Sequence, residues 1–196
     1  MRPFHKLLLS ALAVASVGYH FYHNTTIMLF FFLSISALAV FSRKNPDYSS
    51  FLIKLSLLAL LDLILNIGLE NFVVGKYSGL TQNNIIFSFA LLIDITITYV
   101  SVTSLKTFSD QKAKLAVQVN IIMFSLFCII DFLALSENIV RNLDKLGVAD
   151  SFASQFYHWQ FLYDHYELFK TPLLAFTIAF LYAGAFLARS KKVKFA

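Results

Sequence analysis

The sequence predicts an all-α membrane protein, a polytopic bundle of about six transmembrane helices. Hydrophobic residues make up 58% of its 196 residues and charged residues only 14%. A soluble domain usually carries about 25% charged residues, so this chain has too few to cover a surface that faces water. The 22 phenylalanines suit a surface that faces lipid. The length predicts one domain, which in a membrane is a single bundle over residues 1–196.

Six apolar runs are candidates for crossing the membrane. A spanning helix needs about 20 mainly apolar residues, with a usual minimum of about 17. The first two runs are short and lie close together in the sequence, so they are predicted to form a tight helical hairpin. If these two do not both cross, four crossings remain as the alternative. The candidates cover residues 7–22, 27–41, 51–69, 85–105, 117–137 and 172–188.

The first apolar run shares features with a secretory signal peptide. Arg2 and Lys6 provide a basic start, and the triplets Ala-Leu-Ala at 11–13 and Ala-Val-Ala at 13–15 resemble cleavage sites. The apolar stretch in front of these triplets is shorter than the core of a usual signal peptide. We therefore expect the segment to be retained as a span, with cleavage as the alternative.

The distribution of Lys and Arg predicts the orientation of the bundle, because short cytoplasmic connections carry an excess of these residues. With the N-terminus inside, eleven fall on the cytoplasmic side and four on the outer side, while Lys54 falls within a span. The inner set is Arg2, Lys6, Arg43, Lys44, Lys106, Lys112, Lys114, Arg189, Lys191, Lys192 and Lys194, and the outer set is Lys76, Arg141, Lys145 and Lys170. The pattern predicts an even number of crossings, with both termini cytoplasmic in a plasma membrane of the bacterial inner-membrane type.

The longest connection is an outer loop at residues 138–171. Gly147 is a predicted break, and Asp150 or Ser151 suits the N-cap of a following helix. Aromatic residues then recur at alternating steps of four and three, which predicts an amphipathic helix lying in the outer membrane interface. A helix that caps the bundle is the alternative. The aromatic positions are Phe152, Phe156, Trp159, Tyr163 and Tyr166.

Three carboxylates, Asp62, Asp94 and Asp131, lie within predicted spans. Each costs roughly 2.5–3.5 kcal/mol at a helix centre, so retaining three implies a gain in packing, partnership or transport. At a rise of about 1.5 Å per residue, they lie about 17, 17 and 21 Å from the cytoplasmic ends of their spans. No Lys or Arg is predicted at that level. Without counter-charges, at least one of the three is expected to hold a proton at neutral pH.

Polar neighbours extend this group of acids. Asn66 and Thr98 each follow an aspartate by one helical turn, and His20 lies at roughly 20 Å on the same scale. The sequence therefore predicts a proton or cation site. The alternative is that the same groups hydrogen-bond to one another and only hold the helices together. The predicted site comprises Asp62, Asn66, Asp94, Thr98, Asp131 and His20.

Two outer histidines are weak candidates for a metal site. His158 and His165 are seven residues apart, which places both on one helix face, near Asp164 and Glu167. Because this spacing is not specific to metal ligands, we interpret them as interfacial polar residues and predict no cofactor. The sequence contains no nucleophile-elbow, zinc-protease, phosphate-loop or dinucleotide motif, which favours a protein that is not an enzyme.

The basic C-terminal residues are candidates for contact with anionic lipid or with a soluble partner. The simpler interpretation is that they only fix the topology. No direct nucleic-acid partner is predicted, because the basic residues lie in short runs between apolar stretches. The residues concerned are Arg189, Lys191, Lys192 and Lys194.

Two functions follow from this organisation. The first is a small channel or transporter-like subunit that forms a homo-oligomer and moves protons or cations past the three aspartates. The second is a non-enzymatic sensor, effector or immunity subunit of the toxin or phage-defence type, embedded in the membrane and acting through a soluble cytoplasmic partner. A membrane enzyme that uses the outer histidines and acids is a weaker third alternative.

Overall fold

The computed structural model describes residues 24–109 and 111–189, and these residues form helices and turns without a strand. The long helices are α2 (Asn24–Phe41), α3 (Pro46–Phe72), α4 (Gly79–Ser104), α5 (Gln111–Arg141) and α7 (Phe161–Arg189). Short elements connect them: the 3-10 helices Leu105–Thr107, Asp144–Leu146 and Ser154–Phe156, and the four-residue helix α6 (Asp150–Ala153).

Four stretches of the described chain are long and apolar enough to cross a membrane, which confirms the prediction of an all-α chain with several helices able to span a bilayer. They are Pro46–Phe72, Gly79–Thr107, Ala113–Arg141 and Asp150–Phe186. The predicted second span corresponds to α2, which is a shorter apolar helix. The predicted first span, at 7–22, lies outside the described residues. The prediction of about six crossings therefore stays a prediction.

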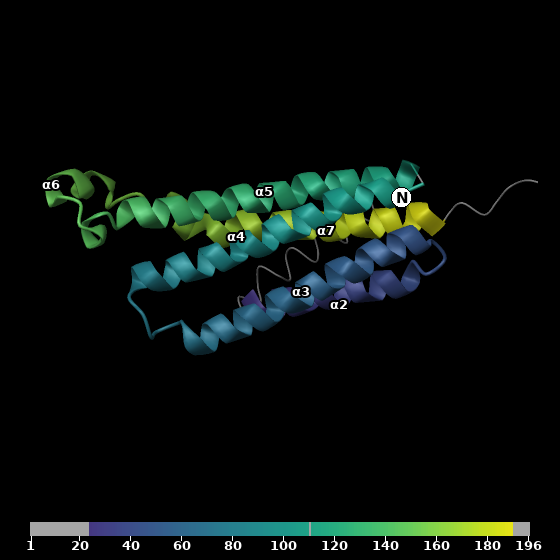
Figure 1. Ribbon diagram of the computed structural model, residues 1–196, viewed down its shortest axis with the longest axis horizontal. Coiled ribbons are helices and arrows are strands. Elements are labelled where there is room, and N and C mark those ends of the chain that lie inside the picture. The colour runs from purple at the N-terminus through teal and green to yellow at the C-terminus, as the bar shows by residue number, and fades with distance from the viewer. Residues whose placement is uncertain (1–23, 110, 190–196) are drawn as a thin grey trace, which may run out of the picture.

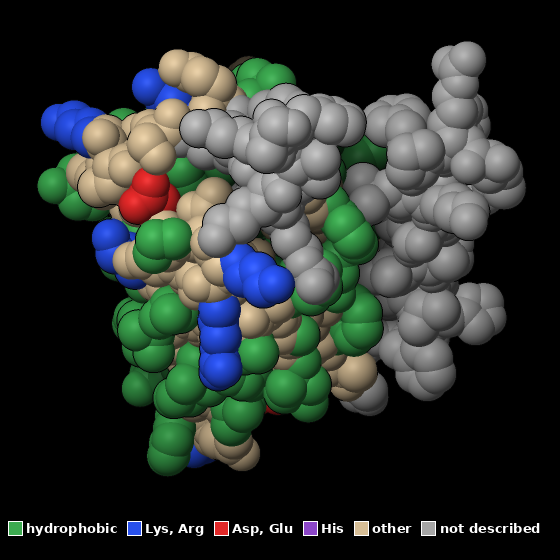
Figure 2. All heavy atoms as spheres, turned by 90° about the vertical axis from the view of Figure 1, so that its right-hand side faces the viewer, with side chains coloured by type: hydrophobic (Ala, Val, Ile, Leu, Met, Phe, Trp, Pro, Cys, Tyr) green, Lys and Arg blue, Asp and Glu red, His purple; other side chains and the backbone are tan. Residues whose placement is uncertain are grey.

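The bundle is elongated, with α4, α5 and α7 packed together and the α2–α3 pair beside them (Figure 1). The chain runs up and down, so its connections gather at two ends. The α2–α3 turn, the α4–α5 connection and the end of α7 lie at one end, which we name the basic end. The α3–α4 turn and the α5–α7 connection lie at the other, which we name the loop end. Figure 2 looks onto the basic end, where Lys and Arg side chains gather among apolar ones.

A three-helix contact near the basic end fixes how α3, α5 and α7 pack. Asn45 caps α3, because its side-chain oxygen accepts a hydrogen bond of 3.1 Å from the backbone N–H of Tyr48. The Tyr48 side chain is fully buried, and its hydroxyl donates to the backbone oxygen of Leu181 on α7 at 2.8 Å. Gly184, one turn further along α7, makes room for the Tyr48 ring and for Ala116 of α5.

Polar side chains tie α4 and α5 together at the loop end. The Asn138 side chain of α5 is buried, and its amide donates to Asn84 Oδ1 at 2.8 Å and to the backbone oxygen of Leu80 at 3.3 Å. Its amide oxygen accepts from Asn83 at 3.4 Å and from Arg141 at 3.2 Å. A buried amide with its donor and acceptor both used stabilises this contact without an unmet polar group.

Glu137 of α5 caps the start of α7. Its two carboxylate oxygens accept hydrogen bonds from the backbone N–H groups of Leu162, at 3.2 Å, and Tyr163, at 2.8 Å. A negative side chain suits these free N–H groups and the positive end of the helix dipole. The cap explains why α7 begins at Phe161, well before the apolar run that the sequence predicted as the last span.

The outer connection is therefore shorter than predicted, since it runs only from 142 to 160. Pro172, the predicted start of the span, lies inside α7. Gly147 does break the chain, with a φ of 87° after the 3-10 helix Asp144–Leu146. The single amphipathic helix predicted from the aromatic spacing does not form, because those residues are divided between α6, a 3-10 turn, an irregular stretch and α7.

Candidate functional site

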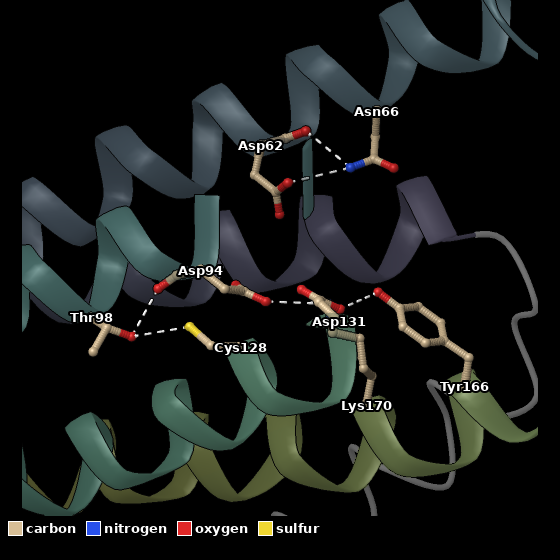
Figure 3. A network of polar contacts seen from close by, with 8 residues as sticks. All are labelled: Asp62, Asn66, Asp94, Thr98, Cys128, Asp131, Tyr166 and Lys170. Atoms are coloured by element: carbon tan, nitrogen blue, oxygen red, sulfur yellow. Dashed lines mark hydrogen bonds and ion pairs between the residues drawn. The ribbon is translucent and has the colours of Figure 1, made fainter. Parts of the chain in front are cut away.

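The long α7 helix carries a lysine into the middle of the predicted acidic site. Lys170 Nζ lies 2.6 Å from Asp131 Oδ1 on α5 and 3.2 Å from Asp94 Oδ2 on α4 (Figure 3). The prediction that no Lys or Arg lies at the level of the aspartates is therefore wrong. It placed Lys170 in the outer loop, because it started the last span at Pro172. The two carboxylates share one ammonium group instead of standing without a counter-charge.

The ion pairs are shielded from solvent. The exposed fraction is 0% for the side chain of Asp131, 13% for Asp94 and 19% for Lys170. The Tyr166 hydroxyl, one turn before Lys170 on α7, donates a 2.5 Å hydrogen bond to Asp131 Oδ1. Asp131 Oδ2 is buried and has no hydrogen-bond partner within the part of the chain that the structure describes. Removing either sign of charge from such a place leaves the other uncompensated.

Aromatic rings complete the surroundings of the lysine. Lys170 Nζ lies 5.0 Å from the centre of the Tyr166 ring and 5.5 Å from that of Phe127. Cations within about 6 Å of a ring face are attracted by its quadrupole. The ammonium group is thus held by two carboxylates and two rings from α4, α5 and α7.

Asp62 approaches the same region from α3. Its carboxylate oxygen Oδ1 and its backbone oxygen accept from the Asn66 amide at 3.3 and 3.2 Å. Figure 3 shows the Asp62 side chain extending from α3 toward Asp94 and Asp131.

A cavity of about 110 Å³ lies between α2, α3, α4, α5 and α7. Two of the three aspartates, Asp62 and Asp94, line it together with Asn66, Lys170 and Glu167. Apolar side chains form most of the remaining wall. They include Ile27, Met28, Phe31, Leu65, Leu69, Ile86, Phe89, Ala90, Ile93, Ile97, Phe124, Phe127 and Leu174.

Thr98 lies beside this site, and its hydroxyl contacts backbone and sulfur. Thr98 Oγ1 donates to the backbone oxygen of Asp94 at 2.8 Å and lies 3.6 Å from Cys128 Sγ. A Thr hydroxyl bonded to the carbonyl four residues earlier satisfies itself within its own helix. Thr98 thus links α4 to α5 one turn from the ion pairs.

The other predicted residues do not join the cluster. His20 and the three tail lysines, Lys191, Lys192 and Lys194, lie outside the described residues. Arg189 ends α7 at the basic end.

The two outer histidines do not share a helix face. His158 is exposed and precedes α7, whereas His165 lies within α7 and its Nδ1 is 2.8 Å from the backbone oxygen of Phe161. Within the described parts of the chain, no three His, Cys, Asp or Glu side chains lie close enough to hold a metal ion.

Sequence reasoning missed Lys170, Tyr166 and Glu167. The sequence held a signal for two of them. Tyr166 ends the series of aromatic residues that begins at Phe152, and Lys170 follows it by a further step of four. Continuing that helical period through residue 170 places the lysine on the face that carries Tyr163 and Tyr166. The last span was instead predicted to begin at Pro172, because polar residues precede the apolar run there.

Comparison of the chain with protein-family models, curated proteins and solved structures gives no match. The functional interpretation therefore rests on the residues and geometry of this chain.

Proposed function

We propose that this membrane protein binds protons or small cations at the cluster of Asp62, Asp94, Asp131 and Lys170 and passes them across the bilayer. The observation that carries the proposal is the excess of acid beside an internal cavity. Two aspartates, on α4 and α5, share one lysine, and two further acids, Asp62 and Glu167, line the same cavity. Acids inside a membrane bundle are costly, and those beyond what Lys170 pairs with are candidates for an ion or proton pathway.

The geometry supports a simple exchange step. Lys170 holds Asp94 at 3.2 Å and Asp131 at the shorter distance of 2.6 Å. A proton or cation that reaches Asp94 through the cavity competes with the longer of these contacts, while Asp131 and the Tyr166 hydroxyl keep their partners. Lys170 therefore remains charge-paired throughout the exchange, which avoids an isolated charge in the membrane.

We further propose that the basic end faces the cytoplasm of a plasma membrane. The connections at this end and the first turn of α5 carry Arg43, Lys44, Lys106 and Lys114, while Lys76, Arg141 and Lys145 lie at the loop end. The excess of positive charge follows the rule for cytoplasmic connections. The cavity lies within one chain, so the proposed path runs inside the bundle even if copies of the protein assemble into a homo-oligomer.

Cation flux through purified protein in liposomes tests the proposal. We expect Asp94→Asn to lower proton or potassium flux about tenfold or more, because an amide keeps the shape of the side chain but lost contacts to charged groups cost about 1.5–3 kcal/mol. Glu70→Gln, an exposed acid on α3 that accepts from Thr25, is the matched control and should conduct like wild type. If Asp94→Asn conducts like wild type for every ion tested, the cluster is not the path.

The basic end favours the second function predicted from the sequence, a membrane subunit that acts through a soluble partner. Figure 2 shows several positive side chains on this face, with apolar and other side chains between them. The flux assay separates the two functions. A wild-type protein that conducts nothing, yet retains an acidic soluble protein only while Arg43, Lys44 and Lys106 are intact, supports the partner-based function.

A further inference from the structure

The surroundings of Lys170 show how this protein holds an ammonium group. Carboxylate oxygens of Asp94 and Asp131 accept from the group, and the ring faces of Phe127 and Tyr166 cover it. Carboxylates combined with aromatic faces are the usual chemistry for recognising organic ammonium ions. The cluster therefore already displays one bound ammonium, supplied by its own side chain.

Two further acids at the same cavity lie outside these ion pairs. Asp62 accepts from the Asn66 amide, and Glu167 lines the cavity from α7, one turn before Thr171. No ion pair joins Asp62 or Glu167 to a Lys, Arg or His among the residues that the structure describes. Asp131 Oδ2 is a buried acceptor that the described residues leave without a donor. The cluster thus has acceptor capacity beyond what Lys170 uses.

The wall of the cavity selects the kind of cation. Phe31, Phe89 and Leu65 are among its mostly apolar lining. A divalent metal ion requires about six oxygen ligands around one point, and the described acids do not gather closely enough for this. An ammonium ion with a short carbon chain fits both the acids and the apolar lining of the cavity. Its charge contacts the acids, and its carbon atoms contact the apolar wall.

The volume limits the length of that carbon chain. The cavity measures about 110 Å³. An apolar cavity of about 150 Å³ in another protein accommodates benzene, so the apolar part of a ligand here should be slightly smaller than benzene. A chain of a few carbons fits this space.

We propose that the cavity binds a small alkylammonium cation, with Asp62 accepting hydrogen bonds from the ammonium group and the apolar wall covering its carbon chain. This inference rests on the proposed function, since it names the substrate class of the same cluster. Lys170 stays on Asp94 and Asp131, so the bound cation occupies the α3 side of the cavity.

The test is binding of n-butylammonium to the full-length protein in lipid nanodiscs. Binding is measured as a change in the midpoint temperature of thermal unfolding. We expect a saturable rise of the midpoint in wild type with butylammonium chloride, none with 1-butanol, and a smaller rise with potassium chloride at equal concentration, because potassium meets the acids but not the apolar wall. Asp62→Asn should weaken binding about tenfold or more, because it removes the charge that receives the ammonium group. Glu70→Gln, two turns away on the same helix, should bind like wild type.

A second variant guards against misfolding of Asp62→Asn. Ala90→Leu adds carbon atoms to the cavity wall and should also weaken butylammonium binding while all acids stay in place. Unchanged affinity in both variants, or equal shifts with 1-butanol, would overturn the inference. Proton flux without butylammonium binding overturns this inference alone. Butylammonium binding without flux of any cation retains the site and removes the proposed transport.

Discussion

Lys170→Met should destabilise the protein by about 3–5 kcal/mol, the usual cost of leaving a buried charge without its partner. Methionine keeps much of the length of the lysine stem, so the substitution removes charge more than volume. Asp131 has no exposed side-chain surface and keeps only the Tyr166 hydroxyl as a described donor.

A double variant separates charge from packing. Lys170→Met with Asp131→Asn should be more stable than Lys170→Met alone, because the second change removes the stranded carboxylate. Lys44→Met, at an exposed lysine of the α2–α3 turn, is the matched control and should change stability by less than about 0.5 kcal/mol. Each variant is unfolded in mixed micelles by raising the fraction of a denaturing detergent. The transition gives the free energy of unfolding of that variant. If the double variant is no more stable than Lys170→Met, the ion pair between Lys170 and Asp131 does not contribute to stability as described.

Gly184→Ala should destabilise the bundle by about 3 kcal/mol, which combines overpacking of about 1–3 kcal/mol with weakening of one hydrogen bond. An added Cβ at Gly184 would lie 2.7 Å from Tyr48 Cζ and 2.8 Å from the Ala116 side chain, and it would also overlap the Tyr48 hydroxyl. Tyr48 is fully buried and bonded to the Leu181 backbone, so it has little room to move. The same unfolding measurement reports the loss.

Gly68→Ala is the control for the helix propensity of alanine. An added Cβ at Gly68, within α3, meets no atom within 4 Å. Alanine is favoured over glycine in a helix by about 1 kcal/mol, so this variant should be neutral or slightly more stable than wild type. Equal effects of the two substitutions would mean that the three-helix contact at Gly184 does not limit packing.

Composition and run length were enough to predict the membrane helices, because each described span exceeds the length that a bilayer requires. The ranges predicted at 51–69 and 117–137 lie inside α3 and α5, and the range 85–105 lies inside α4 except for Leu105, which begins the following 3-10 helix. Helix ends were harder to predict. The start of α7 depends on Glu137 of α5, which caps the helix. It also depends on the ion pair between Lys170 of α7 and Asp131, which offsets the cost of a charge in that helix. A hydropathy pattern does not show such contacts between residues that are far apart in the sequence.

The candidate site was predicted in part. Counting residues along each span brought Asp94 and Asp131 to similar depths, and the structure joins them through Lys170. The sequence could not show which way each helix turns, since packing sets that rotation. It also could not show that Asp62 reaches the cavity while Thr98 bonds to its own helix. Lys170 was missed because a charge next to a proline resembles a loop when only local composition is considered.

Amine labelling tests most directly whether Lys170 is the buried counter-charge of the aspartates inside the bundle. The protein in nanodiscs is treated with a water-soluble amine-reactive ester, and each lysine is then quantified by mass spectrometry. Lys76 and Lys145 are exposed at the loop end and should react readily. Lys170, paired with Asp94 and Asp131, should stay unlabelled until the protein is unfolded. Labelling of Lys170 as fast as Lys145 in the folded protein would contradict the account.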